Sequence, residues 1–190
     1  MYDSESGAID VSLERYRHYL LLLARLQLDA PLAGKVDLSG VVQQTLFEAH
    51  QAAREIQTLP SGRRTIWLRQ VLAHNLADEI RKLRTDMRDV RREKSLEAAI
   101  ESSSQHLEQW LQSADPTPSD RLSRQEQALQ LADALGRLPE AQREALVQQY
   151  WQGRSVGEIA EQMGRTRTAV AGLLKRGLQQ LRESFTGKIL

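Results

Sequence analysis

Apolar residues recur every three to five positions along most of this chain of 190 residues. Between residues 64 and 87 the pattern comprises Ile66, Trp67, Val71, Leu76, Ile80 and Leu83. This spacing places them on one side of an α-helix, where Trp67 is expected to be buried. The same periodicity predicts helices near 12–28, 39–56 and 124–135. No stretch alternates apolar and polar residues as a half-buried strand does, so the sequence predicts an all-α protein.

Loop signals divide the predicted helices into two small domains. Residues 1–11 are polar and unpatterned, which predicts an N-terminal tail before a first domain at 12–94. Residues 95–122 contain the stretches "ESSSQ" and "SADPTPSD" and few apolar residues, which predicts a flexible linker. The alternative is a short docking helix around Leu107, Trp110 and Leu111. A second helical domain is predicted at 123–190.

Charged residues are distributed unevenly, although the formal net charge is only +1. Residues 81–94 are rich in arginine and lysine, whereas residues 95–120 contain neither. The acidic residues of that second stretch are Glu97, Glu101, Glu108, Asp115 and Asp120. Segregated charge of this kind indicates basic modules joined by an acidic connector, a pattern typical of proteins that bind nucleic acid.

The sequence offers no constellation for catalysis or metal binding. It has no cysteine, which excludes disulfides and cysteine-ligated zinc, and its four histidines lack metal-binding spacing. There is no glycine-rich phosphate loop and no nucleophile elbow, so we expect neither an enzyme nor a cofactor. The apolar run "YLLLLARLQL" is too short and too polar for a membrane span. We therefore expect a cytoplasmic protein without membrane insertion.

The stretch "SVGEIAEQMGRTRTAVAGLLKR", which begins at Ser155, predicts two short helices around a turn. Ser155 and Glu158 have the spacing of a capping box at the start of the first helix. Gly164 permits the left-handed backbone that a helix-turn-helix needs, and Thr166 or Thr168 can cap the second helix. The buried face of the second helix is predicted to consist of Val170, Leu174, Leu178 and Leu181.

A helix pair with a basic exposed face is typical of DNA-binding proteins. The residues expected to contact DNA lie at the turn and on the exposed face: Arg165, Thr166, Arg167, Thr168, Ala171, Lys175 and Arg176. Arg167 can donate two hydrogen bonds to a guanine, while flanking basic residues hold phosphates. The alternative is an ordinary helical hairpin with solvated arginines.

Two segments of the first domain add surfaces of other kinds. The stretch "DLSGVVQQTLFEAHQA" predicts an amphipathic helix that exposes Gln43, Gln44 and Glu48, a face suited to a partner protein. Farther along, "WLRQVLAHNLADEIRKLR" predicts a helix that presents His74 and Asn75 and ends in a basic run. The asparagine can bond bases or phosphates, or it can cap a helix, and the residues alone leave both roles open.

In this order the segments resemble a sigma factor of bacterial RNA polymerase, of the small extracytoplasmic-function type in the sigma-70 family. The family segment "DLVQETF" corresponds to residues 41–47, with Gly40 where the family has an acid. The pattern "WLxxIARNxxxDxxR" is matched at 67–81, and "LPxxxREVxxLRYxxGxSxxEIAxxLG" at 138–164. The resemblance covers residues 12–185, nearly the whole chain.

The resemblance implies a two-point grip on promoter DNA by a protein bound to core RNA polymerase. Polymerase contacts are then expected at Asp37, Val41, Val42, Gln43, Gln44 and Glu48. Contacts with the minus-ten element are expected at His74, Asn75, Asp78, Arg81, Lys82, Arg84 and Arg88, with one base of the opened strand captured near Asn75. The helix-turn-helix residues would contact the minus-thirty-five element. An anti-sigma factor is a further partner that the family makes common.

Two features depart from or extend the family pattern. Where the family has a basic-Ser-Arg triplet in the recognition helix, this chain has Ala171, Gly172 and Leu173. Glycine inside a helix costs roughly 1 kcal/mol relative to alanine, so Gly172 is expected to serve a close approach, either to DNA or to the preceding helix. The acidic linker suits a chain that threads a basic nucleic-acid channel, and a solvated spacer is the alternative.

Other functional classes are compatible with parts of the sequence. The main alternative is a stand-alone helix-turn-helix regulator that does not bind core polymerase and binds symmetric half-sites as a dimer. The basic recognition helix argues against a helical interaction protein such as an anti-sigma partner. An RNA-binding protein would be expected to expose aromatic residues for base stacking, which this sequence lacks.

Overall fold

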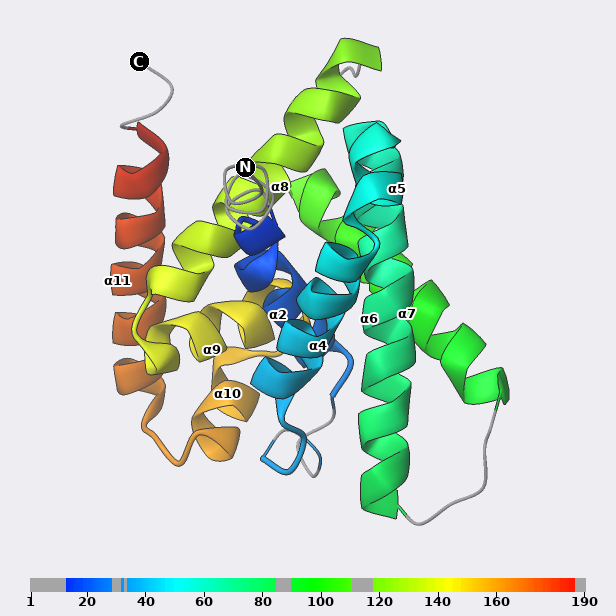
Figure 1. The fold of residues 1–190 in the computed structure, drawn as a ribbon. Coiled ribbons are helices and arrows are strands. Elements are labelled where there is room, and N and C mark those ends of the chain that lie inside the picture. Colours follow the sequence, from blue (N-terminus) through cyan, green and yellow to red (C-terminus); the bar gives the residue numbers. More distant parts are fainter. Residues whose placement is uncertain (1–12, 29–31, 33, 85–89, 111–117, 187–190) are drawn as a thin grey trace, which may run out of the picture. The chain divides into compact units, whose positions relative to one another are not determined.

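The computed structural model describes residues 13–28, 32, 34–84, 90–110 and 118–186 (Figure 1). Every regular element among these residues is a helix, which confirms the predicted all-α class. The chain divides into two compact units, Met1–Leu129 and Gln130–Leu190. The predicted boundaries at 94 and 123 therefore differ from the observed division, which falls within a helix.

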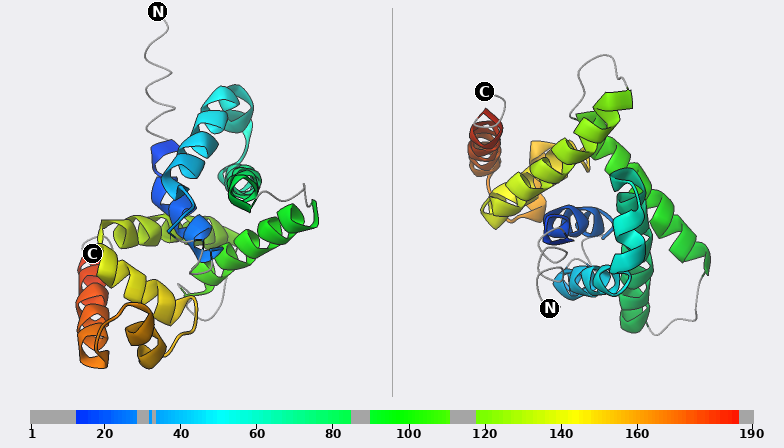
Figure 2. Two further views of the ribbon diagram at one scale, coloured as in Figure 1. Left: turned by 90° about the horizontal axis from the view of Figure 1, so that it is seen from below. Right: turned by 45° about the horizontal axis from the view of Figure 1, so that its top comes forward.

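Within the described residues, the first unit contains α2 (Arg17–Leu26), α4 (Leu38–Gln51), α5 (Ala53–Thr58), α6 (Ser61–Arg84), α7 (Val90–Trp110) and the start of α8 (Pro118–Arg137). Helices α2, α4, α6 and α7 pack against one another, and α4 and α6 lie side by side (Figures 1 and 2). Their shared core contains the fully buried side chains Leu20, Leu23, Leu68, Leu72, Leu76, Ile100 and Leu107.

Helix α4 is capped at its start by Asp37, a residue for which the family resemblance implied a contact with polymerase. The Asp37 carboxylate accepts a hydrogen bond from the Gly40 amide at 2.9 Å, so Asp37 satisfies one of the free N–H groups of the first turn. The predicted helix at 39–56 is divided at Ala52 into α4 and α5. In α6 the side chain of Trp67 is half-buried rather than buried as predicted.

The prediction of a linker at 95–122 is wrong for residues 95–110. These residues form most of α7, and Leu96, Ile100 and Leu107 are buried in the first unit. Ser104 is also buried, with 1% of its surface exposed. Residues 118–122 of the predicted linker are also helical, because they form the start of α8 (Pro118–Arg137). Residues 111–117, with Leu111 of the alternative docking helix, lie outside the described residues.

A buried polar cluster explains why a serine-rich stretch packs in this way. The Tyr19 hydroxyl lies 2.8 Å from Ser104 Oγ, and Arg69 Nη1 donates to both oxygens at 3.2 and 3.0 Å. Arg69 Nη2 lies 2.7 Å from the Glu101 carboxylate. Ser104 and Glu101, which α7 brings to this interface, therefore both have partners, as polar groups at a buried interface require.

Glu108 lies on the same helix and provides a test of this packing by pH. Burial raises the pKa of its carboxyl above the ordinary 4.5, Arg69 opposes that rise, and the charge of Glu101 adds to it. A folded-state pKa above the unfolded value means that stability is fully present below about pH 4.5 and falls as the pH rises through the folded-state pKa.

We therefore expect Glu108→Gln to raise the melting temperature of the chain at pH 7.5 and to change it little at pH 4. Thermal unfolding followed by circular dichroism measures both values. The matched control is Glu97→Gln, which changes an exposed carboxylate on the same helix and should have no such pH-dependent effect. A lower melting temperature for Glu108→Gln at pH 7.5 would contradict the assignment.

The second unit is built from the end of α8 (Pro118–Arg137) and from α9 (Glu140–Tyr150), α10 (Val156–Gln162) and α11 (Arg167–Thr186). Pro139 is the residue before α9, and Gly153 has a positive φ of 66° in the loop that follows that helix. Helices α9, α10 and α11 pack together around Ala145, Ile159, Ala160, Val170 and Leu173 (Figure 2). This small core fixes the orientation of α10 relative to α11.

Candidate nucleic-acid interface

The start of α10 is fixed by the capping box that the sequence predicted. The Ser155 hydroxyl accepts from the Glu158 amide at 3.3 Å, and the Glu158 carboxylate accepts from the Ser155 amide at 2.8 Å. The Ser155 hydroxyl also donates to the Glu158 carboxylate at 2.7 Å, and this bond together with the one from the Ser155 amide lowers the pKa of the exposed Glu158 carboxyl. The first helix of the pair therefore begins at a defined residue, as predicted.

The turn between α10 and α11 depends on Gly164. Its φ of 61° is a left-handed conformation that glycine adopts without strain. The amide of Arg165 donates to the Ala160 carbonyl at 2.9 Å, which closes the end of α10. Thr166 Oγ1 accepts from the Ala169 amide at 3.2 Å, so Thr166 rather than Thr168 caps α11. The two helices thus form a helix-turn-helix.

The buried face of α11 differs by one position from the predicted one. Val170 and Leu181 are buried as expected, but Leu173 and Gly177 complete the buried row. Leu174 and Leu178 are half-buried at the edge of this row. The sequence does not distinguish the two faces, because Leu173 and Leu174 are adjacent and equally apolar. Gly177 packs so closely that a Cβ there would lie 2.8 Å from Leu146 Cδ1.

All the helix-turn-helix residues predicted to contact DNA are exposed: Arg165, Thr166, Arg167, Thr168, Ala171, Lys175 and Arg176. They occupy the turn and the first three turns of α11. The Arg167 guanidinium lies over Gly157 of α10, where an added Cβ would be 3.3 Å from Nη2. A cationic surface at the start of the second helix is the geometry that positions side chains in a DNA groove.

The first unit presents part of the surface that was predicted to bind polymerase. Gln43 and Gln44 are exposed on α4, and Gln44 Nε2 donates to the half-buried Glu48 carboxylate at 2.8 Å. Val41 and Val42 are 5% and 0% exposed, so their predicted role as contacts is wrong and they belong to the core. Their burial follows from the position of α4, which packs on both α2 and α6.

Phe47 is a surface residue of α4 that the sequence analysis did not include among the contacts. Its side chain is 53% exposed, beside the polar face of Gln43 and Gln44. A large exposed aromatic residue on an otherwise polar helix face is a feature of protein interfaces. Its position directly after the "VVQQTL" segment was the available signal in the sequence.

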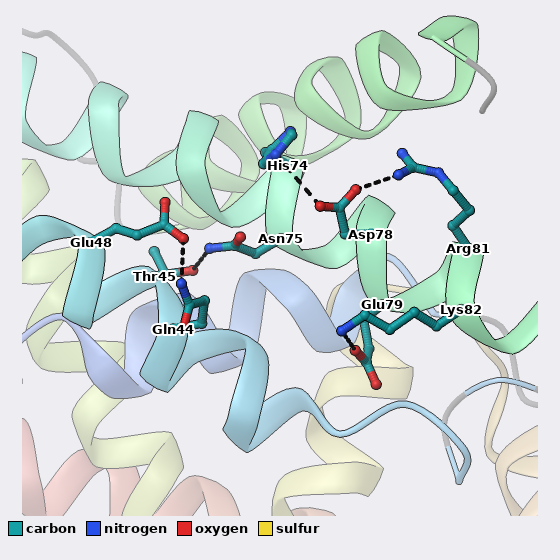
Figure 3. A network of polar contacts seen from close by, with 9 residues as sticks. All are labelled: Gln44, Thr45, Glu48, His74, Asn75, Asp78, Glu79, Arg81 and Lys82. Atoms are coloured by element: carbon teal, nitrogen blue, oxygen red, sulfur yellow. Dashed lines mark hydrogen bonds and ion pairs between the residues drawn. The ribbon is translucent and has the colours of Figure 1, made fainter.

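Helix α6 carries a row of charged residues in which most positive groups are paired (Figure 3). Asp78 accepts from Arg81 Nη1 at 2.6 Å and lies 3.6 Å from His74 Nε2. Lys82 Nζ lies 3.0 Å from Glu79. Asp78 therefore orients two neighbouring side chains, and the DNA contact expected of it stays a prediction.

The two other basic residues predicted for the minus-ten contact cannot be placed. Arg84 is the last residue of α6, and its side chain is outside the description of the structure, as is the whole of Arg88.

Asn75 does not have the capping role that the sequence left open for it, and its contact with a base or phosphate stays a prediction. It lies in the interior of α6, so it does not cap the helix. Its Nδ2 donates to Thr45 Oγ1 of α4 at 3.2 Å (Figure 3). Asn75 is half-buried, whereas Thr45 is completely buried. The side chain is therefore held at the edge of the α4–α6 interface.

Comparison with known protein families identifies the helix-turn-helix unit. Residues 128–181, from α8 to α11, match the family described as "Sigma-70, region 4". Residues 128–181 therefore form a domain of the sigma-70 region 4 family. The match covers less than a third of the chain and includes only the last two residues of the first unit. A comparison with curated proteins found no match.

The region 4 domain explains one departure from the family pattern in physical terms. Leu173 is 8% exposed and belongs to the core, so a basic residue there would be buried. Gly172 lies on the exposed side of α11, and the nearest atoms to an added Cβ would be those of Arg176, with Nη1 at 3.2 Å. The expectation that Gly172 serves contact with the preceding helix is therefore wrong, whereas an approach to DNA remains a prediction.

The described parts of both units show neither a metal-binding cluster nor a membrane-spanning helix. No histidine and carboxylate side chains gather in groups of three or more that could hold a metal ion among these residues. None of the helices within the described ranges is long and apolar enough to cross a membrane.

Proposed function

We propose that this protein is a sigma factor of the sigma-70 family, of the small extracytoplasmic-function type, which binds core RNA polymerase and directs transcription from specific promoters. The observation that carries the proposal is the exposed basic surface at the start of α11 within a matched region 4 domain. The size of the chain, 190 residues, is consistent with that type. The protein acts by binding, with no catalytic step of its own, in the cytoplasm.

Promoter recognition would use both units. In the region 4 domain, Arg167 and Thr168 would meet base edges of the minus-thirty-five element, while Lys175 and Arg176 hold phosphates. In the first unit, His74, Arg81 and Lys82 on α6 would approach the minus-ten element. Arg81 and Lys82 have carboxylate partners that a DNA phosphate could replace. Exposed ion pairs are weak, so such exchange costs little.

Docking on core polymerase would use the exposed face of α4. This face offers Gln43, Gln44 and Phe47, with Asp37 exposed at its N-terminal end. An aromatic anchor surrounded by hydrogen-bonding side chains is a common composition of protein interfaces. A stand-alone regulator would have no use for such a face, which favours the sigma-factor proposal over that alternative.

The deciding experiment is gel filtration of the purified chain with bacterial core RNA polymerase, beside the double variant Gln43→Ala/Gln44→Ala. We expect co-elution of the unaltered chain and its loss in the variant, because both amides lie on the proposed docking face. A matched control is Gln51→Ala, an exposed glutamine at the end of the same helix.

The opposite result would favour the alternative function. If the unaltered chain does not bind core polymerase but binds a palindromic DNA site tightly as a dimer, the protein is a conventional helix-turn-helix regulator. Circular dichroism of the double variant confirms that any loss of binding does not come from unfolding.

A further inference from the structure

A single buried hydroxyl joins the proposed polymerase-docking helix to the proposed minus-ten helix. Thr45 lies between Gln44 and the Phe47 position on α4, yet none of its surface is exposed. Its Oγ1 donates to the Val41 carbonyl at 2.9 Å and accepts from Asn75 Nδ2 of α6 at 3.2 Å. The hydroxyl therefore uses its proton for Val41 and a lone pair for Asn75.

The direction of these hydrogen bonds fixes the orientation of the Asn75 amide. A hydroxyl has one proton, and that of Thr45 points to Val41, so only a lone pair faces Asn75. Asn75 must then direct its NH₂ group inward and its carbonyl oxygen away from Thr45, as Figure 3 shows. The outward group is consequently an acceptor beside His74 and Asp78.

We propose that Thr45 is a positioning residue that determines how Asn75 discriminates among the bases of the opened promoter strand. The inference rests on the proposed function and on the expectation from the sequence that one base of the opened strand is captured near Asn75. A fixed amide presents its acceptor in one direction and accepts a hydrogen bond from a base donor there. If the side-chain amide of Asn75 could flip by 180°, it would present its donor or its acceptor equally well. The preference for one base would then fall.

The test uses holoenzyme made from core polymerase and the full chain, with forked DNA whose single-stranded segment is randomised. Sequencing of the bound fraction gives the base preference at each position. Thr45→Val removes the hydroxyl but keeps a similar shape at this buried position. We expect the preference at one position to fall about fivefold to tenfold, the range typical of one lost hydrogen bond, with core affinity unchanged within about twofold.

Two further variants separate positioning from a general structural effect. Thr45→Ser keeps the hydroxyl and should retain the preference. In an Asn75→Ala background, Thr45→Val should cause no further loss at that position, because the side chain that it positions is absent. An unchanged preference in Thr45→Val, or equal losses at all positions, would overturn the proposal.

Failure of the proposed function is detected separately. If the unaltered chain does not bind core polymerase, the sigma-factor proposal fails, and the orientation of Asn75 is then read in the free chain by nuclear magnetic resonance. A positioned amide gives contacts between its NH₂ protons and the Thr45 side chain that disappear in Thr45→Val. An Asn75 side chain that samples several rotamers in the unaltered chain overturns the positioning role itself.

Discussion

Replacement of Arg167 by alanine is expected to weaken binding of the minus-thirty-five element by about tenfold to 100-fold and to relax base preference at one position. Arg167 is exposed in the first turn of α11, where side chains of a recognition helix reach base edges. A bidentate arginine–guanine contact contributes about 1–3 kcal/mol of discrimination. The measurement is selection of random duplex DNA by holoenzyme, followed by titration of the selected duplex.

Two matched variants distinguish base recognition from loss of charge. Lys175→Ala should weaken binding similarly for all sequences and reduce the salt dependence by about one phosphate contact. Arg137→Ala removes an exposed arginine at the end of α8 in the same unit and should leave DNA binding unchanged. If Arg167→Ala behaves like Lys175→Ala, Arg167 contacts a phosphate rather than a base.

Replacement of Gly177 by alanine is expected to destabilise the region 4 domain by about 1–2 kcal/mol, although alanine is the better helix former. The new Cβ would lie 2.8 Å from Leu146 Cδ1 and 3.5 Å from Gln142 Cβ. Leu146 is completely buried, so its side chain cannot avoid the new methyl group by turning into solvent. Overpacking costs about 1–3 kcal/mol or more, which exceeds the gain of roughly 1 kcal/mol in helix propensity.

The same substitution at Gly172 should have the opposite sign. There the Cβ would meet only the flexible end of Arg176, so the propensity gain remains and the domain is stabilised by about 0.5–1 kcal/mol. Hydrogen exchange of the amides in 130–190, measured by mass spectrometry, reports the stability of this unit separately. Slower exchange in Gly177→Ala than in the unaltered chain would show that α9 and α11 are less tightly packed than described.

The sequence predicts most of the helix-turn-helix because its signals are local. Ser155, Glu158 and Gly164 act on neighbouring backbone groups, and each has the predicted role in the structure. The buried face of α11 was predicted less well, since Leu173 and Leu174 are equally apolar. The choice between them depends on Gly177, whose close contact with α9 has no apolar signal in the sequence.

The predictions that failed in the first unit failed because burial there depends on contacts between residues far apart in the sequence. Ser104 and Glu101 look like residues of a solvated linker until Arg69 and Tyr19, far away in the sequence, provide buried partners. Val41 was assigned to a surface because the family segment that it matches is a binding segment. A helix that packs on two neighbours buries more of its circumference than a single periodic face suggests. The roles of the site residues in binding stay predictions.

The packing of α7 has a practical consequence for anyone who divides this protein into parts. A fragment cut after residue 94, where the charge pattern changes, would lose Leu96, Ile100 and Leu107 from its core. It would also remove Glu101 and Ser104, the α7 partners of the Arg69 guanidinium. A fragment that is to hold the α6 surface in its native form has to include the chain through Trp110. The segment that has to be present for the first unit to fold is thus longer than the segment that carries its expected polymerase and DNA contacts.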